Sequence, residues 1–221
     1  MPKKEAKRKI GDVAVKKRTG HGYDHWFKII DKFDRRKNGH KATAKHLNEK
    51  HGVDEWYAQM ITVEYERKKG IRETGQRITG SYEVSISRTV NVPIEKAFEA
   101  WAKPSALNKW FTTGAKQKFQ EGGTYSNNDK DKGEFKRIVP NKRIRFTWDN
   151  ERHCPGSVVE VRFDEKGPEK VAITIQHEKL PDKKGRDGMK EGWSWALDSY
   201  KSYLETGKGI TFEEWKKSSA K

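Results

Sequence analysis

The sequence contains few arrangements of residues that could carry out acid–base chemistry or bind a metal. Its seven histidines are His21, His25, His40, His46, His51, His153 and His177. Only His21 and His25 have the i, i+4 spacing that can place two imidazoles on one helix face, and Gly20 and Gly22 disfavour a helix there. No His-Glu-x-x-His motif and no pair of cysteines accompanies them. We therefore expect no metal site.

The sequence also lacks motifs that are typical of nucleophilic catalysis or of phosphate binding. Cys154 lies between His153 and Pro155, and adjacent residues in a turn rarely give the geometry of a Cys–His pair. Gly122-Gly123 has neither the spacing nor the following lysine-bearing helix of a phosphate-binding loop. We expect His177 to end a strand and to contact solvent. The sequence predicts no catalytic residue and no cofactor, and enzyme activity is the least favoured alternative.

The net charge of +16 over 221 residues suggests an acidic partner. The charge is densest in residues 1–18, which carry eight basic and two acidic side chains. We expect this segment to be a disordered tail that mainly aids solubility. The alternative is a weak, salt-sensitive contact with nucleic acid or another acidic partner. That contact would use Lys3, Lys4, Lys7, Arg8, Lys9, Lys16, Lys17 and Arg18.

The single cysteine excludes an intramolecular disulfide and suits the reducing cytoplasm. No apolar run approaches the roughly 18 residues needed to span a bilayer, and no signal peptide is visible. We therefore expect a cytoplasmic protein without a membrane span.

Residues 19–73 have the periodicity of a small three-helix domain. The first helix is expected from about Tyr23 and is broken at Asn38-Gly39. The second ends near His51-Gly52, and the third opens at Asp54. In a helix-turn-helix DNA-binding motif, the start of the second helix faces the bases. In this segment that position is the acidic Asp54, which would repel the DNA phosphates. We expect no sequence-specific DNA binding by this domain.

This segment contains several short motifs, which follow one another along the chain. They are Thr19-Gly20, Trp26-Phe27, Gly39-His40-Lys41, His51-Gly52-Val53, Ile61-Thr62-Val63, Tyr65-Glu66-Arg67 and Gly70-Ile71-Arg72. On these residues the segment resembles DUF4287, a small domain family of unknown function. The resemblance implies a domain and no activity. The glycine-containing residues 74–81 are the expected linker.

From Tyr82 onward the pattern is that of strands and helices in an α+β order. Alternating apolar and polar residues predict a strand from Tyr82, two short helices begin near Pro93 and Pro104, and further antiparallel strands follow. Residues 192–204 then form an amphipathic helix. Its apolar face carries Trp193, Ala196, Leu197, Tyr200, Tyr203 and Leu204. We expect a curved sheet wrapped around this helix, with residues 207–221 as an extension.

Residues 82–206 contain a second set of motifs. They are Ser87-Arg88-Thr89-Val90, Val92-Pro93, Ala97-Phe98, Trp110-Phe111, Gly122-Gly123-Thr124-Tyr125, Gly133-Glu134, Arg143-Ile144, Phe146-Thr147-Trp148 and Gly192-Trp193. On them the segment resembles the SRPBCC superfamily (START-like, Bet v 1-like helix-grip), in the branch of the C-terminal domain of the Hsp90 ATPase activator. The resemblance implies a helix-grip fold, in which a curved antiparallel sheet wraps a long C-terminal helix after two short helices.

The resemblance also implies an apolar cavity between the sheet and the C-terminal helix, suited to a hydrophobic or amphipathic small molecule. Its expected lining is Trp101, Trp110, Phe111, Tyr125, Phe135, Phe146, Trp148, Val161, Ile173, Met189 and Trp193. The alternative is that these side chains simply fill the core. A second implied partner is an Hsp90-type chaperone, which would make the chain a co-chaperone-like module.

Overall fold

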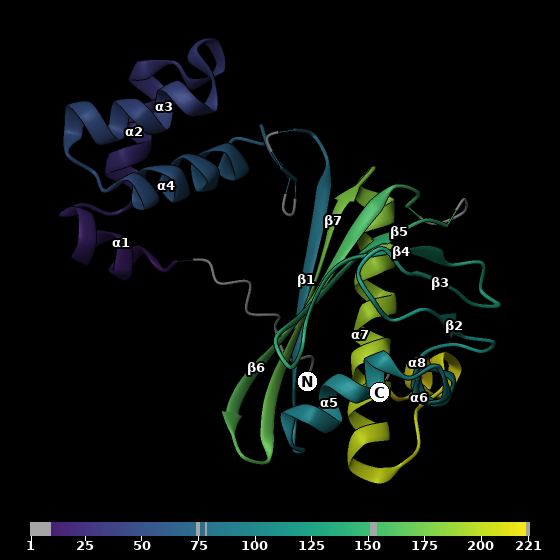
Figure 1. The fold of residues 1–221 in the computed structure, drawn as a ribbon. Coiled ribbons are helices and arrows are strands. Elements are labelled where there is room, and N and C mark those ends of the chain that lie inside the picture. Colours follow the sequence, from purple (N-terminus) through teal and green to yellow (C-terminus); the bar gives the residue numbers. More distant parts are fainter. Residues whose placement is uncertain (1–9, 74–75, 78, 151–153, 220–221) are drawn as a thin grey trace. The chain divides into compact units, whose positions relative to one another are not determined.

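The computed structural model describes residues 10–73, 76–77, 79–150 and 154–219 (Figure 1). The chain divides into two compact units, residues 1–74 and 75–221. Each unit has its own hydrophobic core. Within the described ranges, no helix is long and apolar enough to cross a membrane.

The N-terminal unit contains four helices in its described part, one more than the sequence predicts. Their apolar faces meet in a core that includes Trp26, Ile30, Leu47 and Ile61. The predicted helix start at Asp54 is confirmed, because its carboxylate accepts hydrogen bonds from two backbone N–H groups of the following turn. The helices are α1 (Asp12–Thr19), α2 (Tyr23–Phe33), α3 (Arg35–His51) and α4 (Glu55–Lys68) (Figure 1).

Helix α1 corrects the expectation of a disordered tail for residues 12–18, the part of residues 1–18 that it contains. Val15 is fully buried in the core of the unit, and Oδ1 of Asp12 accepts a 2.6 Å hydrogen bond from the backbone N–H of Tyr23. The basic residues of its last turn suit the negative end of the helix dipole. A single buried valine among charged residues produces no helical periodicity, so the sequence did not predict helix α1. Residues 1–9 lie outside the described residues.

A buried carboxylate joins α4 to the rest of the N-terminal unit. Glu66 is fully buried, and its carboxylate lies 2.9 Å from Nδ1 of His40 and 2.8 Å from Nε of Arg72. Arg35 pairs with the same carboxylate. Burial raises the pKa of Glu66, but hydrogen bonds from His40 and Arg35 outweigh it, and the net shift is downward. This charge cluster fixes the chain that follows α4 to α3.

The C-terminal unit is a seven-stranded antiparallel sheet with the order β1-β7-β6-β5-β4-β3-β2. The long helix α7 packs on β1 and β7 (Figure 1). This architecture confirms the predicted α+β helix-grip fold. The elements are β1 (Tyr82–Val90), α5 (Ile94–Ala102), α6 (Pro104–Trp110), β2 (Lys116–Gln117), β3 (Thr124–Ser126), β4 (Lys132–Val139), β5 (Arg143–Trp148), β6 (Ser157–Gly167), β7 (Lys170–Leu180), α7 (Lys183–Thr206) and α8 (Phe212–Ser219).

Helix α7 starts well before the predicted residue 192. Asp182 caps it by accepting a 2.7 Å hydrogen bond from the backbone N–H of Gly185, so the helix begins at Lys183. Its buried face is the predicted one, except that Tyr203 is only half-buried. The buried stripe carries most of the packing, because each large apolar side chain removed from water contributes roughly 1.5–3 kcal/mol.

The C-terminal extension packs on the outer side of α7. The indole N–H of Trp195 donates a 2.7 Å hydrogen bond to the carbonyl of Ile210. The indole N–H of Trp215, in α8, donates one of 2.9 Å to Oδ2 of Asp198. The extension is therefore part of the folded unit.

Candidate functional site

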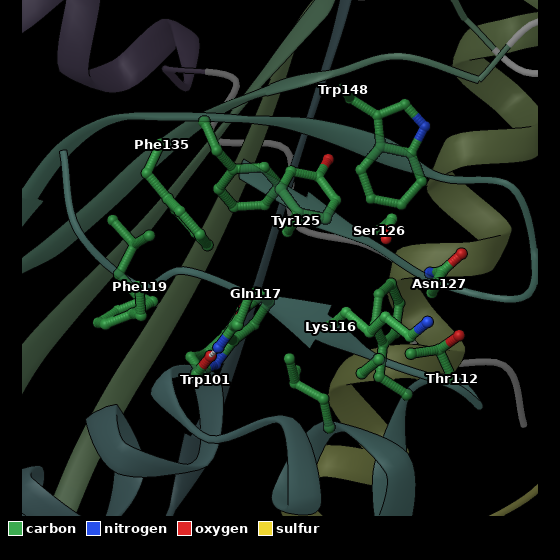
Figure 2. A pocket seen from close by; sticks show the side chains of 15 residues that line it. Trp101, Thr112, Lys116, Gln117, Phe119, Tyr125, Ser126, Asn127, Phe135 and Trp148 are labelled. Carbon is green, nitrogen blue, oxygen red and sulfur yellow. Dashed lines mark hydrogen bonds between the residues drawn. The ribbon is translucent and has the colours of Figure 1, made fainter. Parts of the chain in front are cut away.

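A pocket lies at the end of the sheet that carries the short strands β2 and β3 (Figure 2). Its volume is about 40 Å³, and the empty space reaches about 500 Å³ when the open mouth is included. The enclosed part thus has room for one small group or a few waters, and a larger molecule would lie mostly in the mouth. The lining residues are Trp101, Leu107, Phe111, Thr112, Ala115, Lys116, Gln117, Phe119, Tyr125, Ser126, Asn127, Phe135, Ile144, Phe146 and Trp148.

Two glycines allow close backbone contacts beside this pocket, one between β4 and β5 and one in the connection between β2 and β3. A Cβ atom on Gly133 would lie 2.0 Å from the carbonyl oxygen of Thr147, and one on Gly123 would lie 1.9 Å from the carbonyl oxygen of Lys118. Neither space could hold a side chain without a backbone shift. The close approach lets the Tyr125 hydroxyl donate a 2.9 Å hydrogen bond to the carbonyl of Thr147.

Aromatic rings form most of the pocket wall. Phe119 packs edge-on against Phe135 with ring centroids 5.1 Å apart, and Tyr125 packs edge-on against Phe146 at 5.4 Å. These rings come from β3, β4, β5 and the segment between β2 and β3. Such a wall favours an apolar ligand body, because it offers many contacts and few competing hydrogen bonds.

Polar side chains gather at the other end of the pocket (Figure 2). The hydroxyl of Thr112 donates to Asp129, and the side-chain amide of Asn127 donates to Asp131. Both polar groups therefore have partners. Lys116, by contrast, makes no ion pair or hydrogen bond with its side chain to any residue that the structure describes. Its ammonium group is the unpaired charge of the pocket.

Two indole N–H groups of the lining also lack an acceptor. Nε1 of Trp101 and Nε1 of Trp148 are buried and have no hydrogen-bond partner among the residues that the structure describes. Burial raises the pKa of the Tyr200 hydroxyl, and the nearby Trp101 lowers it to a smaller extent. No hydrogen bond of ordinary geometry joins the Trp101 indole to that hydroxyl. Buried donors without acceptors are costly, so an oxygen atom of a water or a ligand would be favourable at each.

The space under α7, where the cavity was expected, is filled by aromatic side chains. The Trp193 ring stacks on Phe111 with centroids 5.6 Å apart and an interplanar angle of 5°, and it packs edge-on against Trp148 at 5.3 Å. Helix α7 contributes no residue to the pocket lining. The pocket is therefore displaced from the helix toward β2 and β3.

Six of the eleven expected lining residues do line the pocket. They are Trp101, Phe111, Tyr125, Phe135, Phe146 and Trp148. Trp110, Val161, Ile173 and Trp193 are instead buried core residues, and Met189 is partly buried against that core. Lys116 and Gln117 were not predicted to line the pocket, because β2 is only two residues long and leaves no alternating pattern.

His177 is fully buried, which corrects the expectation that it meets solvent. Its Nδ1 accepts a 3.0 Å hydrogen bond from the indole N–H of Trp193, and its Nε2 lies 2.7 Å from Oγ of Ser157. The sequence does contain a pattern that indicates the burial of His177. Val171, Ile173 and His177 are spaced by even numbers and therefore share one face of β7.

This chain of hydrogen bonds argues against a catalytic Ser–His pair. An imidazole that accepts at Nδ1 and stays neutral carries its proton on Nε2, so it donates to Ser157 and cannot take the serine proton. Ser157 in turn donates a 2.6 Å hydrogen bond to the carbonyl of Cys154. Burial lowers the pKa of His177 to about 3, which fits a neutral structural imidazole. The arrangement ties α7 to the sheet.

The residues singled out for nucleic-acid contact are only partly described. Lys16, Lys17 and Arg18 are exposed on α1. The other five, Lys3, Lys4, Lys7, Arg8 and Lys9, lie outside the described residues, as does His153. No further observation in the described ranges favours a nucleic acid.

Comparison with known proteins identifies the fold of the C-terminal unit. The family model described as "Activator of Hsp90 ATPase homolog 1-like protein" matches residues 91–205. The solution structure of CalU16 from Micromonospora echinospora is 23% identical, with a TM-score of 0.54, over 63% of this chain and 75% of that chain. Protein SSP2350 from Staphylococcus saprophyticus is 25% identical, with a TM-score of 0.51, over 58% of this chain and 96% of that chain.

The solution structure of the Aha1 dimer from Colwellia psychrerythraea is also similar, with 18% identity and a TM-score of 0.52 over 57% of this chain and 98% of that chain. Likenesses at this level of identity indicate a shared helix-grip fold. The comparison with curated proteins gives no match. The DUF4287 resemblance of residues 19–73 stays a prediction.

Proposed function

The chain belongs to the activator of Hsp90 ATPase homolog 1-like family, and from that premise we propose that its C-terminal unit binds an amphipathic small molecule with an apolar body and an anionic head. The observation that carries this proposal is the unpaired Lys116 ammonium at the polar end of a pocket with an aromatic wall.

The apolar body is supported by the composition of the wall. Burying an apolar group against Phe119, Phe135 and Phe146 gains roughly 25 cal/mol for each Å² removed from water. The enclosed volume of about 40 Å³ limits how much of the ligand can be enclosed. The ligand would insert one end into the pocket and keep its head in the mouth.

The anionic head is supported by the balance of charge and hydrogen bonds around the mouth. The two nearby carboxylates, Asp129 and Asp131, already accept hydrogen bonds from Thr112 and Asn127. Lys116 has no such partner among the described residues. A carboxylate or sulfonate placed there would gain a charge-assisted hydrogen bond, the stronger kind.

Two fluorescent probes that differ in one group test this proposal. Anilinonaphthalene sulfonate has an aromatic body and an anionic group, and phenylnaphthylamine has a similar body without charge. Lys116→Gln should weaken binding of the sulfonate probe about threefold to fivefold, the upper range for an exposed ion pair, and should leave the neutral probe unchanged. Phe135→Ala should weaken both probes.

Lys118→Gln is the matched control, because this exposed lysine is two residues away and does not line the pocket. It should change neither affinity. Equal losses of both probes in Lys116→Gln, or no loss of either, would contradict an anion-selective pocket.

The family match supports a second candidate, a co-chaperone-like interaction with an Hsp90-type chaperone. Association of the full chain with a purified Hsp90-type chaperone in a pull-down would support it, and absence of association would remove it. If the two functions are separate, Lys116→Gln should leave that association unchanged.

A further inference from the structure

Two histidines meet at the C-terminal end of α3 in the N-terminal unit. Nε2 of His51, the last residue of the helix, lies 3.3 Å from Nε2 of His46. Residues five apart do not normally face each other on a helix. They meet here at the end of the helix, where the chain turns at Gly52, whose φ is 67°. The two ring nitrogens thus point at one another from the helix terminus.

Their separation suits two ligands of one metal ion. Imidazole nitrogens bind zinc at about 2.0–2.1 Å, so two of them at a tetrahedral angle lie about 3.4 Å apart. The alternative is a long hydrogen bond between one protonated and one unprotonated nitrogen. A metal ion would bind the unprotonated Nε2 of each ring.

Aromatic neighbours hold both rings in place. The His46 ring stacks on Phe33 with centroids 4.1 Å apart and an interplanar angle of 14°. The His51 ring packs edge-on against Trp26, 6.2 Å between centroids, and against His46 at 5.0 Å. Phe33 and Trp26 belong to α2. The pair is therefore preorganised by a second helix, which reduces the ordering cost of binding an ion.

The local field at the end of α3 favours a bound cation. Both histidines lie in the last turns of α3, where the helix dipole and the free carbonyls are negative. His46 is half-buried and His51 is exposed, so an ion can reach them.

We propose that His46 and His51 form a two-histidine site for a transition-metal ion of the class that imidazole prefers: Zn²⁺, Ni²⁺ or Cu²⁺. Among the described residues, no group of three or more histidine, cysteine or carboxylate side chains is arranged to hold a metal. Water therefore completes the coordination. The site belongs to the N-terminal unit and is independent of the pocket in the C-terminal unit.

Titration of the untagged full chain with ZnCl₂, NiCl₂ and CuCl₂, followed by calorimetry, tests this site. Binding should be one to one and tightest for Cu²⁺, following the usual order of affinity. His46→Gln and His51→Gln should each weaken it roughly tenfold or more, at least the loss caused by removing outer-shell partners of metal ligands. Far-UV circular dichroism should stay unchanged, since neither ring is fully buried.

The matched control removes two other imidazoles, His21 and His25. Their rings stack 3.7 Å apart beside the same Trp26 indole, and both are exposed. The double variant His21→Gln, His25→Gln should keep full affinity. The proposal would be overturned if metal binding survived both His46→Gln and His51→Gln. It would also be overturned if binding were lost only in the control variant that lacks His21 and His25.

Discussion

The indole N–H of Trp193, on α7, donates a 3.0 Å hydrogen bond to Nδ1 of His177, on β7, with both side chains buried. This bond joins the long helix to β7, the strand next to the β1 edge of the sheet. It lies beside the stacked Phe111 ring, which lines the pocket. The position of the pocket wall therefore depends on how α7 is held.

Trp193→Phe should destabilise the C-terminal unit by about 1–3 kcal/mol. The phenyl ring keeps part of the packing, but Nδ1 of His177 loses the one hydrogen-bond donor that it has among the described residues and stays buried, which carries that cost. Urea denaturation measures the loss. Trp215→Phe offers a comparison in which the lost bond, to Asp198, is only part-buried, and its cost should be smaller. Equal costs for the two variants would contradict this role of Trp193.

The unit should become less stable in mild acid because of His177. Burial lowers the pKa of His177 from 6.5 to about 3, so between these values the unfolded chain binds a proton that the folded chain does not. The free energy of unfolding should therefore fall as pH drops below 6.5, by about 1.4 kcal/mol per pH unit from this group alone. Stability at pH values above 6.5 should be independent of it.

Comparing the native chain with His177→Gln isolates this contribution, because the other titrating groups are shared. The variant should be less stable at neutral pH and should show a shallower decline in acid. Parallel stability curves between pH 6 and 4 would mean that His177 titrates normally in the folded chain.

Gly133→Ala should destabilise the sheet and disturb the pocket. The new Cβ would lie 2.0 Å from the carbonyl oxygen of Thr147 and 2.7 Å from the Tyr125 ring, so backbone and ring must both move. Overpacking of this kind costs about 1–3 kcal/mol. Gly192→Ala is the control, since nothing lies within 4 Å of its Cβ position in α7. It should stabilise the helix by up to about 1 kcal/mol. Similar effects of the two substitutions on denaturation would be inconsistent with the proposed close approach.

The sequence predicts the fold well where the apolar period is long. Residues 144, 146 and 148 alternate in β5, and the stripe from Trp193 to Leu204 follows the helical period, so both elements could be assigned. Helix α1 has only Val15 buried and shows no such period. Composition alone therefore suggests disorder for a segment that tertiary packing makes helical.

The candidate site is predicted less completely, because it depends on the register of strand pairing and on which side chains fill the space beside the sheet. Whether Trp193 leaves a cavity or fills it depends on its contacts with Phe111 and Trp148, which span distant parts of the chain. Lys116 lies on a two-residue strand whose place in the sheet is set by pairing with β3. No local pattern contains that information.

The indole N–H signals of the tryptophans offer the most direct test of the proposed pocket. Trp101 and Trp148 line the pocket with buried N–H groups that have no acceptor, whereas Trp56, 56% exposed, belongs to the other unit. Titration of the ¹⁵N-labelled full chain with decanoate should shift the indole signals of Trp101 and Trp148, leave that of Trp56 unchanged, and have a weaker effect in Lys116→Gln. Shifts confined to Trp56, or unchanged Trp101 and Trp148 signals at saturating decanoate, would contradict binding of an amphipathic anion in this pocket.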